Sequence, residues 1–320
     1  MQASELSVLI PAKNIEEGIL RVITFAAEQL KGIDAEIIIV DMGSSDKTVL
    51  QAVTQLKGLG LHGFVIQNGN SDVPSALNTA VQKACGKYLT FFFARRLYEG
   101  LLHPYLETAK RTNADFVFGC SSKEEARVAE LRNVSSAVHH PDGAFFAESI
   151  LRHRTKIDIA AIMVRRDLLL SNQISFDENY QFGYAEEFLF DCLLNAGTAV
   201  QAATVLKRSK SNEIELPKNA PVGFSVFRRV EAVLRIISTV EYANSQNGEL
   251  LRLLKKDALP RAVMDSVDVV MHEGMSQQRI NAYLRSLDYD RLLTIDRHTD
   301  PNLKRRVILW KTMPWLYRPK

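Results

Sequence analysis

Ile38-Ile39-Val40-Asp41-Met42-Gly43-Ser44-Ser45-Asp46-Lys47-Thr48 joins an apolar run to a helical pattern through an acid and a short polar turn. The apolar run predicts a buried strand, and Ser45 or Asp46 can cap the helix that follows. At the end of a strand, the Asp41 carboxylate can accept hydrogen bonds from a nucleotide base or a ribose. An ordinary strand–turn–helix with a capping aspartate accounts for the same residues. The segment alone leaves both interpretations open.

The same alternation of strand and helix patterns extends over the first 120 residues. Apolar runs predict strands at Leu6–Ile10, Ala35–Val40, Gly63–Ile66, Tyr88–Phe93 and Asp115–Phe118. Helical patterns separate them at Glu16–Leu30, Asp46–Leu56, Val73–Ala84 and Leu101–Arg111. This order predicts βαβ units in a doubly wound α/β sheet. Ligands of such sheets bind beyond the carboxyl ends of the strands, so the candidate site residues lie in Pro11–Asn14, Asp41–Asp46, Asn68–Asp72 and Ala94–Arg96.

Composition narrows the class of protein. The 320 residues are 46% hydrophobic and 24% charged, enough for one large α/β domain and a smaller appendage. A net charge of +3 does not favour a nucleic-acid partner. Cys85, Cys120 and Cys192 lack metal-ligand spacing and have apolar neighbours, so we expect buried thiols in a reducing compartment, the cytoplasm. We expect neither a signal peptide nor a membrane-spanning segment.

Several short segments together resemble family 2 glycosyltransferases. The segment at 7–14 is similar to the opening strand and loop of that family, and the segment at 38–48 resembles its VDDGSxDxT turn. Asn68-Gly69-Asn70 and Ser75-Ala76-Leu77-Asn78 resemble its N-x-G…A-R-N segment. Residues 86–91 resemble its G-x-Y-I-x-F strand, and Phe176-Asp177-Glu178 with Glu186-Glu187 resembles its F-D-E…E-D segment. The matches follow the family's order over about residues 5–210.

The resemblance implies a GT-A fold, a Rossmann-like, doubly wound mixed α/β sheet that binds a nucleotide-sugar donor. It implies inverting transfer of a sugar, with UDP as the expected nucleotide, to a hydroxyl of a glycan or lipid-linked acceptor. Glu187 stands where the family has its general base, with Glu186 beside it; a solvated first helical turn is the alternative for this pair. The expected donor-binding residues are Pro11, Ala12, Asn14, Asp41, Ser44, Asn68, Asn78, Arg95 and Arg96.

One departure from the family bears on its metal. The family's strand ends in Asp-x-Asp, which holds a divalent cation on the donor diphosphate, whereas this chain has Phe93-Ala94-Arg95-Arg96. Met42, Leu77 and Lys13 also replace residues typical of the family. No oxygen ligand remains at that motif, so we expect no divalent metal and no other cofactor. Two arginines bring the same formal charge as the cation and bind phosphate oxygens in fixed geometry.

These replacements are also compatible with three different roles. The chain can be a non-catalytic pseudo-glycosyltransferase that acts as the binding or scaffold partner of an active transferase. It can be an enzyme with altered chemistry or with a metal held elsewhere, or the two arginines can be solvated residues before a helix. A nucleotidyltransferase shares the sheet, but Pro11–Asn14 is not the glycine-rich phosphate loop that such an enzyme needs.

Two further pairs of residues are candidates for phosphate or acceptor contacts. His139 and His140 lie in a polar insertion at about residues 121–155, where surface loop residues are the simpler interpretation. Lys207 and Arg208 follow the last predicted strand, at Ala199–Leu206, and can reach the donor phosphates or be solvated.

We place the catalytic domain at residues 1–212 and a helical C-terminal region at 213–320. The helical patterns are Phe224–Ala243, Glu249–His272 with a break at Pro260, and Ser276–Leu287. The tail at 301–320 carries six cations, no acid and both tryptophans of the chain. Such a composition is typical of a segment that binds a membrane surface, here the inner face of the membrane. A tail packed on its own domain or on a sister subunit of a homo-oligomer, with Val307, Ile308 and Leu309 as core, is the alternative.

Overall fold

The computed structural model describes residues 4–124, 142–179, 182–209, 222–242 and 247–319. The chain divides into two compact units. The first comprises Met1–Phe146, His153–Asn179 and Asp191–Leu216, and the second comprises Ala147–Arg152, Tyr180–Phe190 and Pro217–Lys320. The domain boundary predicted at residues 212/213 lies outside the described residues.

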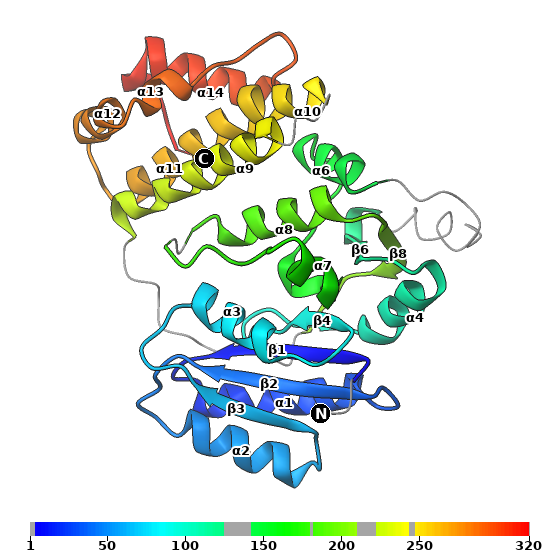
Figure 1. Cartoon of the computed structure of the whole chain (residues 1–320). Coiled ribbons are helices and arrows are strands. Elements are labelled where there is room, and N and C mark those ends of the chain that lie inside the picture. Colours follow the sequence, from blue (N-terminus) through cyan, green and yellow to red (C-terminus); the bar gives the residue numbers. More distant parts are fainter. Residues whose placement is uncertain (1–3, 125–141, 180–181, 210–221, 243–246, 320) are drawn as a thin grey trace. The chain divides into compact units, whose positions relative to one another are not determined.

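A seven-stranded sheet forms the centre of the first unit, with strand order β3-β2-β1-β4-β7-β6-β8 (Figure 1). The strands β1, β2, β3, β4, β6 and β8 are parallel, and only β7 runs against them. Their bounds are β1 Leu6–Ala12, β2 Ala35–Asp41, β3 Gly63–Gln67, β4 Tyr88–Phe91, β6 Phe116–Cys120, β7 Ile162–Arg165 and β8 Ala199–Val205. This is the mixed α/β sheet of a GT-A fold, and it confirms the predicted fold class.

Helices cover both faces of this sheet. On one face, α1 (Glu16–Gln29), α2 (Thr48–Gly58) and α4 (Leu102–Thr112) share a core with alternate residues of β1. Helix α1 buries Ile19, Val22, Ile23 and Ala26, the spacing of one helix face. Helix α3 (Val73–Lys83) lies on the other face of β1 and β2 (Figure 1). The apolar runs predicted as strands are therefore buried on both sides, as parallel strands require.

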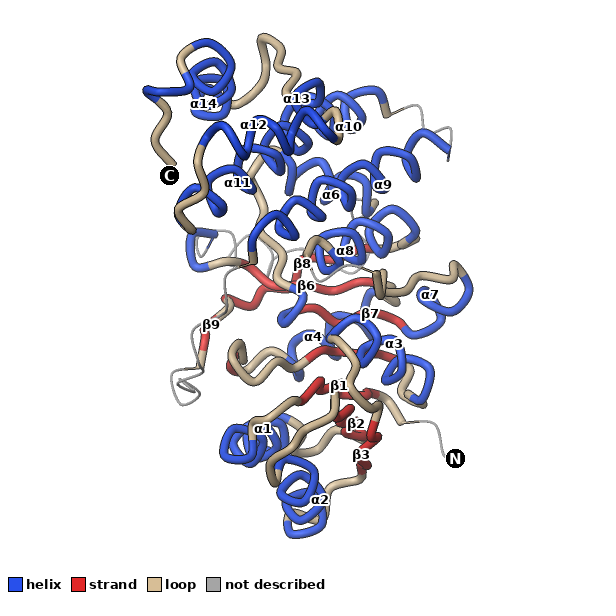
Figure 2. The backbone as a smooth tube through the Cα atoms, turned by 90° about the vertical axis from the view of Figure 1, so that its left-hand side faces the viewer, coloured by secondary structure: helices blue, strands red, loops and turns tan. Residues whose placement is uncertain are grey.

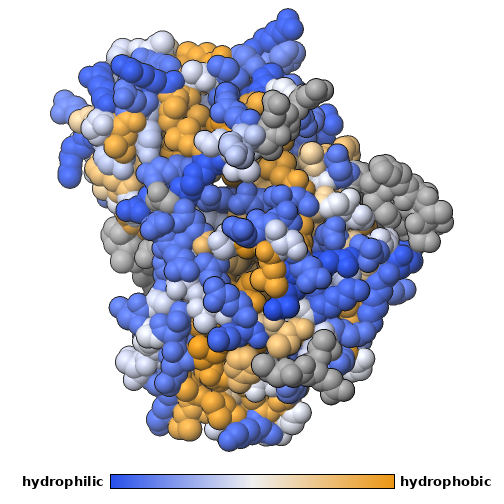
Figure 3. Space-filling view, in the orientation of Figure 1, coloured by the Kyte–Doolittle hydropathy of each residue, from blue (hydrophilic) through white to orange (hydrophobic). Residues whose placement is uncertain are grey.

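Strand β3 is the exception, because it forms an edge of the sheet and is only half-buried. Leu50, Leu59 and Phe64 are exposed on α2, on the loop after it and on β3. Figure 3 shows hydrophobic side chains gathered at this end of the molecule, at the bottom of the view.

Within the mostly apolar segment Ile157–Val164, the strand β7 begins only at Ile162. A 3-10 turn at Ile159–Ala161 precedes β7, and the Asp158 side chain caps this turn through the Ala160 N–H at 3.0 Å. A second, two-stranded sheet pairs β5 (Tyr98–Glu99) with β9 (Lys207–Arg208), a pairing that the sequence did not predict. Figure 2 shows β9 beyond the end of β8.

The second unit is helical, as predicted. Helices α6 (Gly143–Leu151) and α8 (Tyr184–Asn195) contribute one end each to it, and the short helix α7 (Arg166–Ser171) belongs to the first unit. The C-terminal helices are α9 Arg228–Tyr242, α10 Gly248–Leu253, α11 Leu259–His272, α12 Gln277–Ser286, α13 Tyr289–Leu292 and α14 Pro301–Thr312.

The break predicted at Pro260 is wrong, because the chain stays helical through that residue. A π-helical turn, Leu254–Ala258, leads directly into α11, with Pro260 in its first turn. Proline has no N–H to donate to the carbonyl four residues earlier. That carbonyl, of Lys256, instead accepts a hydrogen bond from the Thr299 hydroxyl at 2.8 Å.

The cysteines and the apolar residues of the tail follow the predictions in part. No disulfide joins the three cysteines, and Cys120 and Cys192 are buried, but Cys85 is only half-buried. In the tail, Val307 is buried whereas Ile308 is 48% exposed, so Ile308 is not a core residue. Among the described residues, no helix has the length and apolar character needed to cross a membrane.

Candidate functional site

The carboxyl ends of β1, β2, β3 and β4 lead into the segments that hold the predicted donor residues other than Asn78. These segments and Asn78 of α3 are called here the donor edge (residues 11–16, 41–48, 68–72, 78 and 92–99). Pro11 and Ala12 are the buried last residues of β1. Asn14 follows in the left-handed region, with φ 49°. Its N–H donates to Ser44 Oγ at 2.9 Å, and its Oδ1 accepts from the Ser45 N–H at 2.8 Å. Asn14 and Ser44 therefore fasten the loops after β1 and β2 to each other.

Asp41 ends β2 and turns the chain with its own side chain. Its buried carboxylate accepts hydrogen bonds from the N–H groups of Gly43 and Ser44, at 3.2 to 3.3 Å. Gly43 has φ +81°, and a Cβ atom there would lie 2.8 Å from the carbonyl oxygen of Gly69. Only glycine fits both conditions. A carboxylate has about four acceptor positions, so Asp41 retains capacity for a hydroxyl or base N–H.

Asp46 joins the first turns of two helices. Its Oδ1 accepts from the Thr48 N–H at 3.0 Å and the Thr48 hydroxyl at 2.6 Å, and its Oδ2 accepts from the Glu16 N–H at 3.1 Å. Burial opposes ionisation, but these hydrogen bonds outweigh it and lower the pKa of the Asp46 carboxyl. The N-cap of α2 is Lys47, which makes no side-chain capping bond, so neither Ser45 nor Asp46 is the cap that was predicted. Asp46 lies one residue earlier and binds the first N–H of the helix.

Asn68 and Asn78 have different surroundings at this edge. Asn68 is half-buried after β3, and its N–H donates to the Asp41 carbonyl at 2.8 Å. Asn78, on α3, binds the main chain of Phe176 twice, through its Nδ2 and its Oδ1, both at 2.8 Å. The Asn78 Nδ2 also donates to Glu178 at 2.8 Å. In the structure Asn78 fixes the segment before α8; its predicted contact with the donor remains a prediction.

Arg95 and Arg96 lie in a tight turn just after β4. The Arg96 N–H donates to the Phe93 carbonyl at 2.8 Å, and both arginines are exposed. The Arg96 guanidinium lies 5.7 Å from the centre of the Phe93 ring and 3.2 Å from the Asp158 carboxylate. Tyr98 donates its hydroxyl to the same carboxylate at 2.8 Å. Burial and this hydrogen bond raise the pKa of Tyr98 to about 12, so Tyr98 stays a neutral donor.

The small β5–β9 sheet brings the two predicted pairs of cations together. Tyr98 is opposite Arg208, and Glu99 is opposite Lys207. Arg208 Nη2 donates to the Arg95 carbonyl at 2.7 Å. We call Arg95, Arg96, Lys207 and Arg208 the arginine turn. Arg96 is paired with Asp158, and Glu99 is opposite Lys207 on the neighbouring strand.

The residues of the arginine turn do not fit a divalent cation. The family's metal needs carboxylate oxygens, and Asp158 already binds Arg96 and Tyr98. Across the described ranges, no three His, Cys, Asp or Glu side chains come together in a metal-binding arrangement. The turn instead presents guanidinium groups, which bind phosphate oxygens.

Glu186 and Glu187 lie in the first turn of α8, in the second unit. Glu186 is exposed. Glu187 is 14% exposed, and Arg235 of α9 binds both of its carboxylate oxygens, with Nε–Oε1 at 2.7 Å and Nη2–Oε2 at 2.6 Å. Gly183 allows this approach, because it has φ +86° and a Cβ atom there would lie 2.6 Å from the Ala232 side chain.

Sequence reasoning missed Asp158 and Arg235. Asp158 reaches the donor edge because β7 is antiparallel, so its beginning, not its end, lies there. The segment Ile157–Val164 is mostly apolar, but the direction of a strand cannot be read from an apolar run. Arg235 belongs to an amphipathic helix in which nothing distinguishes it from other polar residues. His139 and His140 lie outside the described residues.

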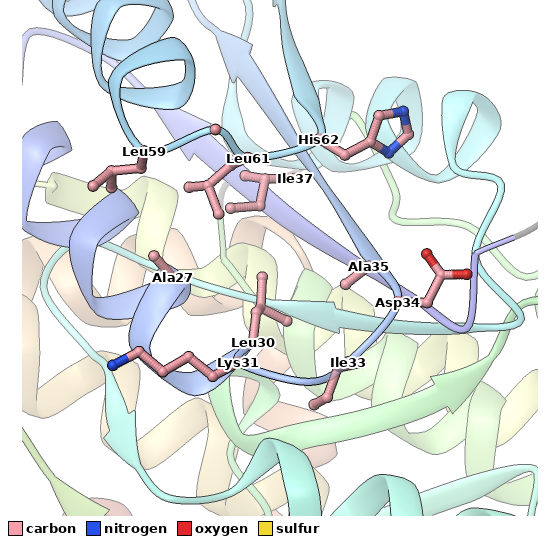
Figure 4. A pocket seen from close by; sticks show the side chains of 11 residues that line it. Ala27, Leu30, Lys31, Ile33, Asp34, Ala35, Ile37, Leu59, Leu61 and His62 are labelled. Atoms are coloured by element: carbon pink, nitrogen blue, oxygen red, sulfur yellow. The ribbon is translucent and has the colours of Figure 1, made fainter.

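A cavity of about 490 Å³ lies at the opposite edge of the sheet (Figure 4). Its lining comes from the end of α1, the beginning of β2 and the loop before β3. Figure 4 shows Leu30, Ile37 and Leu61 in its wall, with Lys31 and His62 on opposite sides of the view. None of the predicted site residues lines this cavity, and in parallel sheets the amino ends of the strands are not the usual place for ligands.

Comparisons with solved structures agree with the fold. S. aureus TarS 1–349 in complex with UDP-GlcNAc aligns with a TM-score of 0.62 and 17% identity, over 98% of this chain and 93% of that one. A mannosyltransferase from Pyrobaculum calidifontis, in complex with GDP-Man and Mn²⁺, aligns with a TM-score of 0.56 and 14% identity, over 97% and 85%. At these identities the likeness concerns the fold alone.

Comparisons of sequence identify the family. A Mycobacterium tuberculosis (strain CDC 1551 / Oshkosh) protein, provisionally described as a glycosyltransferase, is 32% identical over 124 residues, 38% of this chain. The match spans about a third of that relative's length. The family model described as "Glycosyl transferase family 2" matches residues 7–169, about half of the chain, from β1 to α7. The chain therefore belongs to glycosyl transferase family 2.

Proposed function

We propose that this glycosyltransferase moves a sugar from a UDP-linked donor to a hydroxyl group of a glycan or lipid-linked acceptor, with inversion and without a bound metal. Family membership supports the transfer reaction. The nucleotide is proposed from TarS, whose structure was obtained with UDP-GlcNAc. The donor lies at the donor edge, with its base and ribose near Asp41 and Asn68, and its diphosphate at the arginine turn.

The observation that carries the proposal is the position of the arginine turn. Arg95 and Arg96 lie in the turn a few residues after β4, at the place where the family has its metal-binding acids, and β9 adds Lys207 and Arg208. A unit charge about 4 Å from another contributes roughly 4 kcal/mol at an effective dielectric constant near 20. The guanidinium groups of Arg95 and Arg96 carry the same formal charge as a divalent cation, and in this proposal they neutralise the leaving diphosphate. Asp158 holds Arg96 in place, since it binds the guanidinium at 3.2 Å.

The proposed reaction needs a general base and a group of cations that binds the leaving diphosphate. The acceptor oxygen attacks the anomeric carbon, and its proton passes to the Glu187 carboxylate. The bond between the anomeric carbon and the diphosphate oxygen breaks, and its electron pair leaves with UDP. The arginine turn binds the charge that develops on the diphosphate. Arg235 orients the Glu187 carboxylate before the acceptor binds.

The experiment is release of UDP from UDP-sugars in the presence of a chelator, with an acceptor mixture of glycans and lipid-linked sugars. The proposal expects release by the natural chain with chelator present, and loss of at least about 10²-fold in Glu187→Gln. Glu186→Gln is the matched control, because it removes a neighbouring exposed carboxylate. Turnover that appears only after a divalent cation is added would refute the metal-free reaction.

A non-catalytic scaffold is the second candidate, and one observation favours it. Both Glu187 oxygens are engaged by Arg235, as in a structural ion pair. A scaffold would bind a nucleotide or another transferase without turnover, and Glu187→Gln would leave that binding unchanged. UDP binding with no release from any UDP-sugar tested would favour this alternative.

A further inference from the structure

We propose that the end of the C-terminal tail is a binding surface for an anionic lipid bilayer. The surface, called here the terminal face, consists of Ile308, Lys311, Met313, Trp315, Leu316 and Arg318. It belongs to the second unit and does not depend on the proposed reaction. A bilayer with anionic headgroups is the partner to which we assign it.

Large apolar side chains are exposed close together in the sequence of this face. Trp315 is 65% exposed, Leu316 53%, Ile308 48% and Met313 38%. Trp315 and Leu316 lie in the 3-10 turn Pro314–Leu316, directly after α14. Ile308 lies one helical turn before Thr312 and so adjoins that end of the helix. Monomeric soluble proteins rarely leave such a group of side chains in water without a partner.

The neighbouring side chains hold this segment in place, so its exposure is part of the folded structure. Trp310 and Tyr317 are buried on either side of it, with their rings edge to face at 5.3 Å. The Tyr317 hydroxyl donates to Asp268 of α11 at 2.5 Å. Gln277 of α12 donates its side-chain N–H to the Pro314 carbonyl at 2.5 Å. The turn that carries Trp315 is thus fixed at both ends.

The charges of the segment distinguish a bilayer from other partners. Residues 301–320 contain no acid. Arg306 is paired with Asp265 and Asp268 at 2.7 and 2.8 Å, whereas Arg305, Lys311 and Arg318 are exposed. A second copy would bring the same cations face to face and would be repelled. Anionic headgroups attract such cations by about 1 kcal/mol each, and tryptophan prefers the boundary between headgroups and acyl chains.

The two tryptophans provide a direct probe of this binding. Both tryptophans of the chain lie in the tail, and Trp310 is 4% exposed while Trp315 is open to solvent. We expect phosphatidylglycerol-containing vesicles to shift the emission to shorter wavelength, and pure phosphatidylcholine vesicles to leave it unchanged. The shift should weaken as salt is added, and Trp315→Phe should abolish it while the protein still sediments with the vesicles.

Two variants test the two components of the surface separately. Lys311→Gln/Arg318→Gln should weaken binding to the anionic vesicles roughly 30-fold, which corresponds to about 1 kcal/mol for each cation. Trp315→Ser/Leu316→Ser should remove sedimentation with the vesicles. Leu50→Ser is the matched control, because Leu50 is 62% exposed on α2 in the first unit. This variant should bind the vesicles as the natural chain does.

The proposal is overturned by any of three results. These are no emission shift with anionic vesicles, equal binding to phosphatidylcholine, or unchanged binding in Trp315→Ser/Leu316→Ser. Sedimentation equilibrium without lipid tests whether a second copy of the chain, and not a bilayer, covers the terminal face. A dimer that Trp315→Ser/Leu316→Ser dissociates would assign the terminal face to a second copy of the chain.

Discussion

Single side chains of the donor edge act mainly by fixing the backbone of neighbouring loops. Asn14 binds the loop after β2, Asp41 binds its own turn, and Asn78 binds the main chain of Phe176. The residue types at these positions could be recognised from the sequence, because they matched a known family pattern. Their partners could not, since Asn78 and Phe176 are 98 residues apart.

Arg235 is the residue whose role is easiest to test separately from binding of the donor. Its planar guanidinium binds both oxygens of Glu187, a geometry that lysine cannot reproduce. We expect Arg235→Ala to lower kcat by about 10²-fold, because small displacements of a catalytic group have effects of that size. Arg235→Lys should restore only part of the loss.

The measurement for Arg235 is kcat together with the dissociation constant for UDP by calorimetry. A positioning role lowers kcat and leaves UDP binding unchanged. If Arg235→Ala lowered kcat and the affinity for UDP equally, or if Arg235→Lys restored the full kcat, the ion pair would serve stability alone.

Gly43 gives a prediction about both stability and binding. Replacement by alanine meets a positive φ and a carbonyl oxygen at 2.8 Å. We expect Gly43→Ala to lower the free energy of unfolding by about 3 kcal/mol and to weaken UDP binding. Gly60→Ala is the matched control, since Gly60 has φ +62° with no atom within 4 Å of its added Cβ. Gly60→Ala should lower the free energy of unfolding by about 1 kcal/mol. If urea unfolding gave the same loss for Gly43→Ala and Gly60→Ala, the close approach of the Gly69 carbonyl to Gly43 would not matter for stability.

At the scale of helices and strands, most of the fold could be predicted from apolar runs and their spacing. The strands β1, β2, β4 and β6 lie where those runs were found, because burial on both faces requires apolar residues. The edge strands β3 and β8 also lie at predicted runs, although β3 is only half-buried. The direction of β7 and the pairing of β5 with β9 could not be predicted, since each is fixed by contacts between segments far apart in the chain. The break at Pro260 was predicted wrongly because Thr299 satisfies the Lys256 carbonyl left without the proline N–H.

The junction of α1 and α2 carries a prediction about pH. The pKa of Asp46 is lowered from its ordinary value of 3.8, so its ionised form is favoured in the folded state. The stabilisation is therefore complete above pH 4 or so and is lost as the pH falls through the folded-state pKa. Asp46→Asn keeps an oxygen that can accept from Thr48 but loses the oxygen that accepts from the Glu16 N–H. We expect it to lower the free energy of unfolding by about 1 kcal/mol at pH 7.

Urea unfolding of Asp46→Asn between pH 7 and pH 3 provides the measurement. The difference in the free energy of unfolding between Asp46→Asn and the natural chain should shrink as the pH falls below 4. Glu17→Gln, in the first turn of α1, is the control for general loss of an acid. A difference that stays constant with pH would contradict the assigned cause.

At the scale of the whole molecule, the two units carry separable properties. The tail contributes to the second unit through Arg306, which is 13% exposed and binds Asp265 and Asp268. We expect Arg306→Ala to lower the free energy of unfolding by about 3 kcal/mol, because it removes the guanidinium that binds the buried Asp268 carboxylate. The dissociation constant for UDP should not change, since the donor edge belongs to the first unit.

Thermal unfolding and calorimetry on the same preparation test this prediction. Lys304→Ala is the control, because it removes another cation of α14, one that donates to the backbone carbonyl of Arg297 at 2.7 Å. A stability change below about 1 kcal/mol in Arg306→Ala, or a parallel loss of UDP binding, would contradict it.

The central claim, that guanidinium groups replace a metal at the donor diphosphate, is tested most directly by titrating UDP into the protein by calorimetry in excess chelator. We predict that the natural chain binds UDP equally well with and without chelator, and that Arg95→Ala/Arg96→Ala loses at least about 10²-fold in affinity. Binding that the chelator abolishes, or that survives in Arg95→Ala/Arg96→Ala, would contradict the claim.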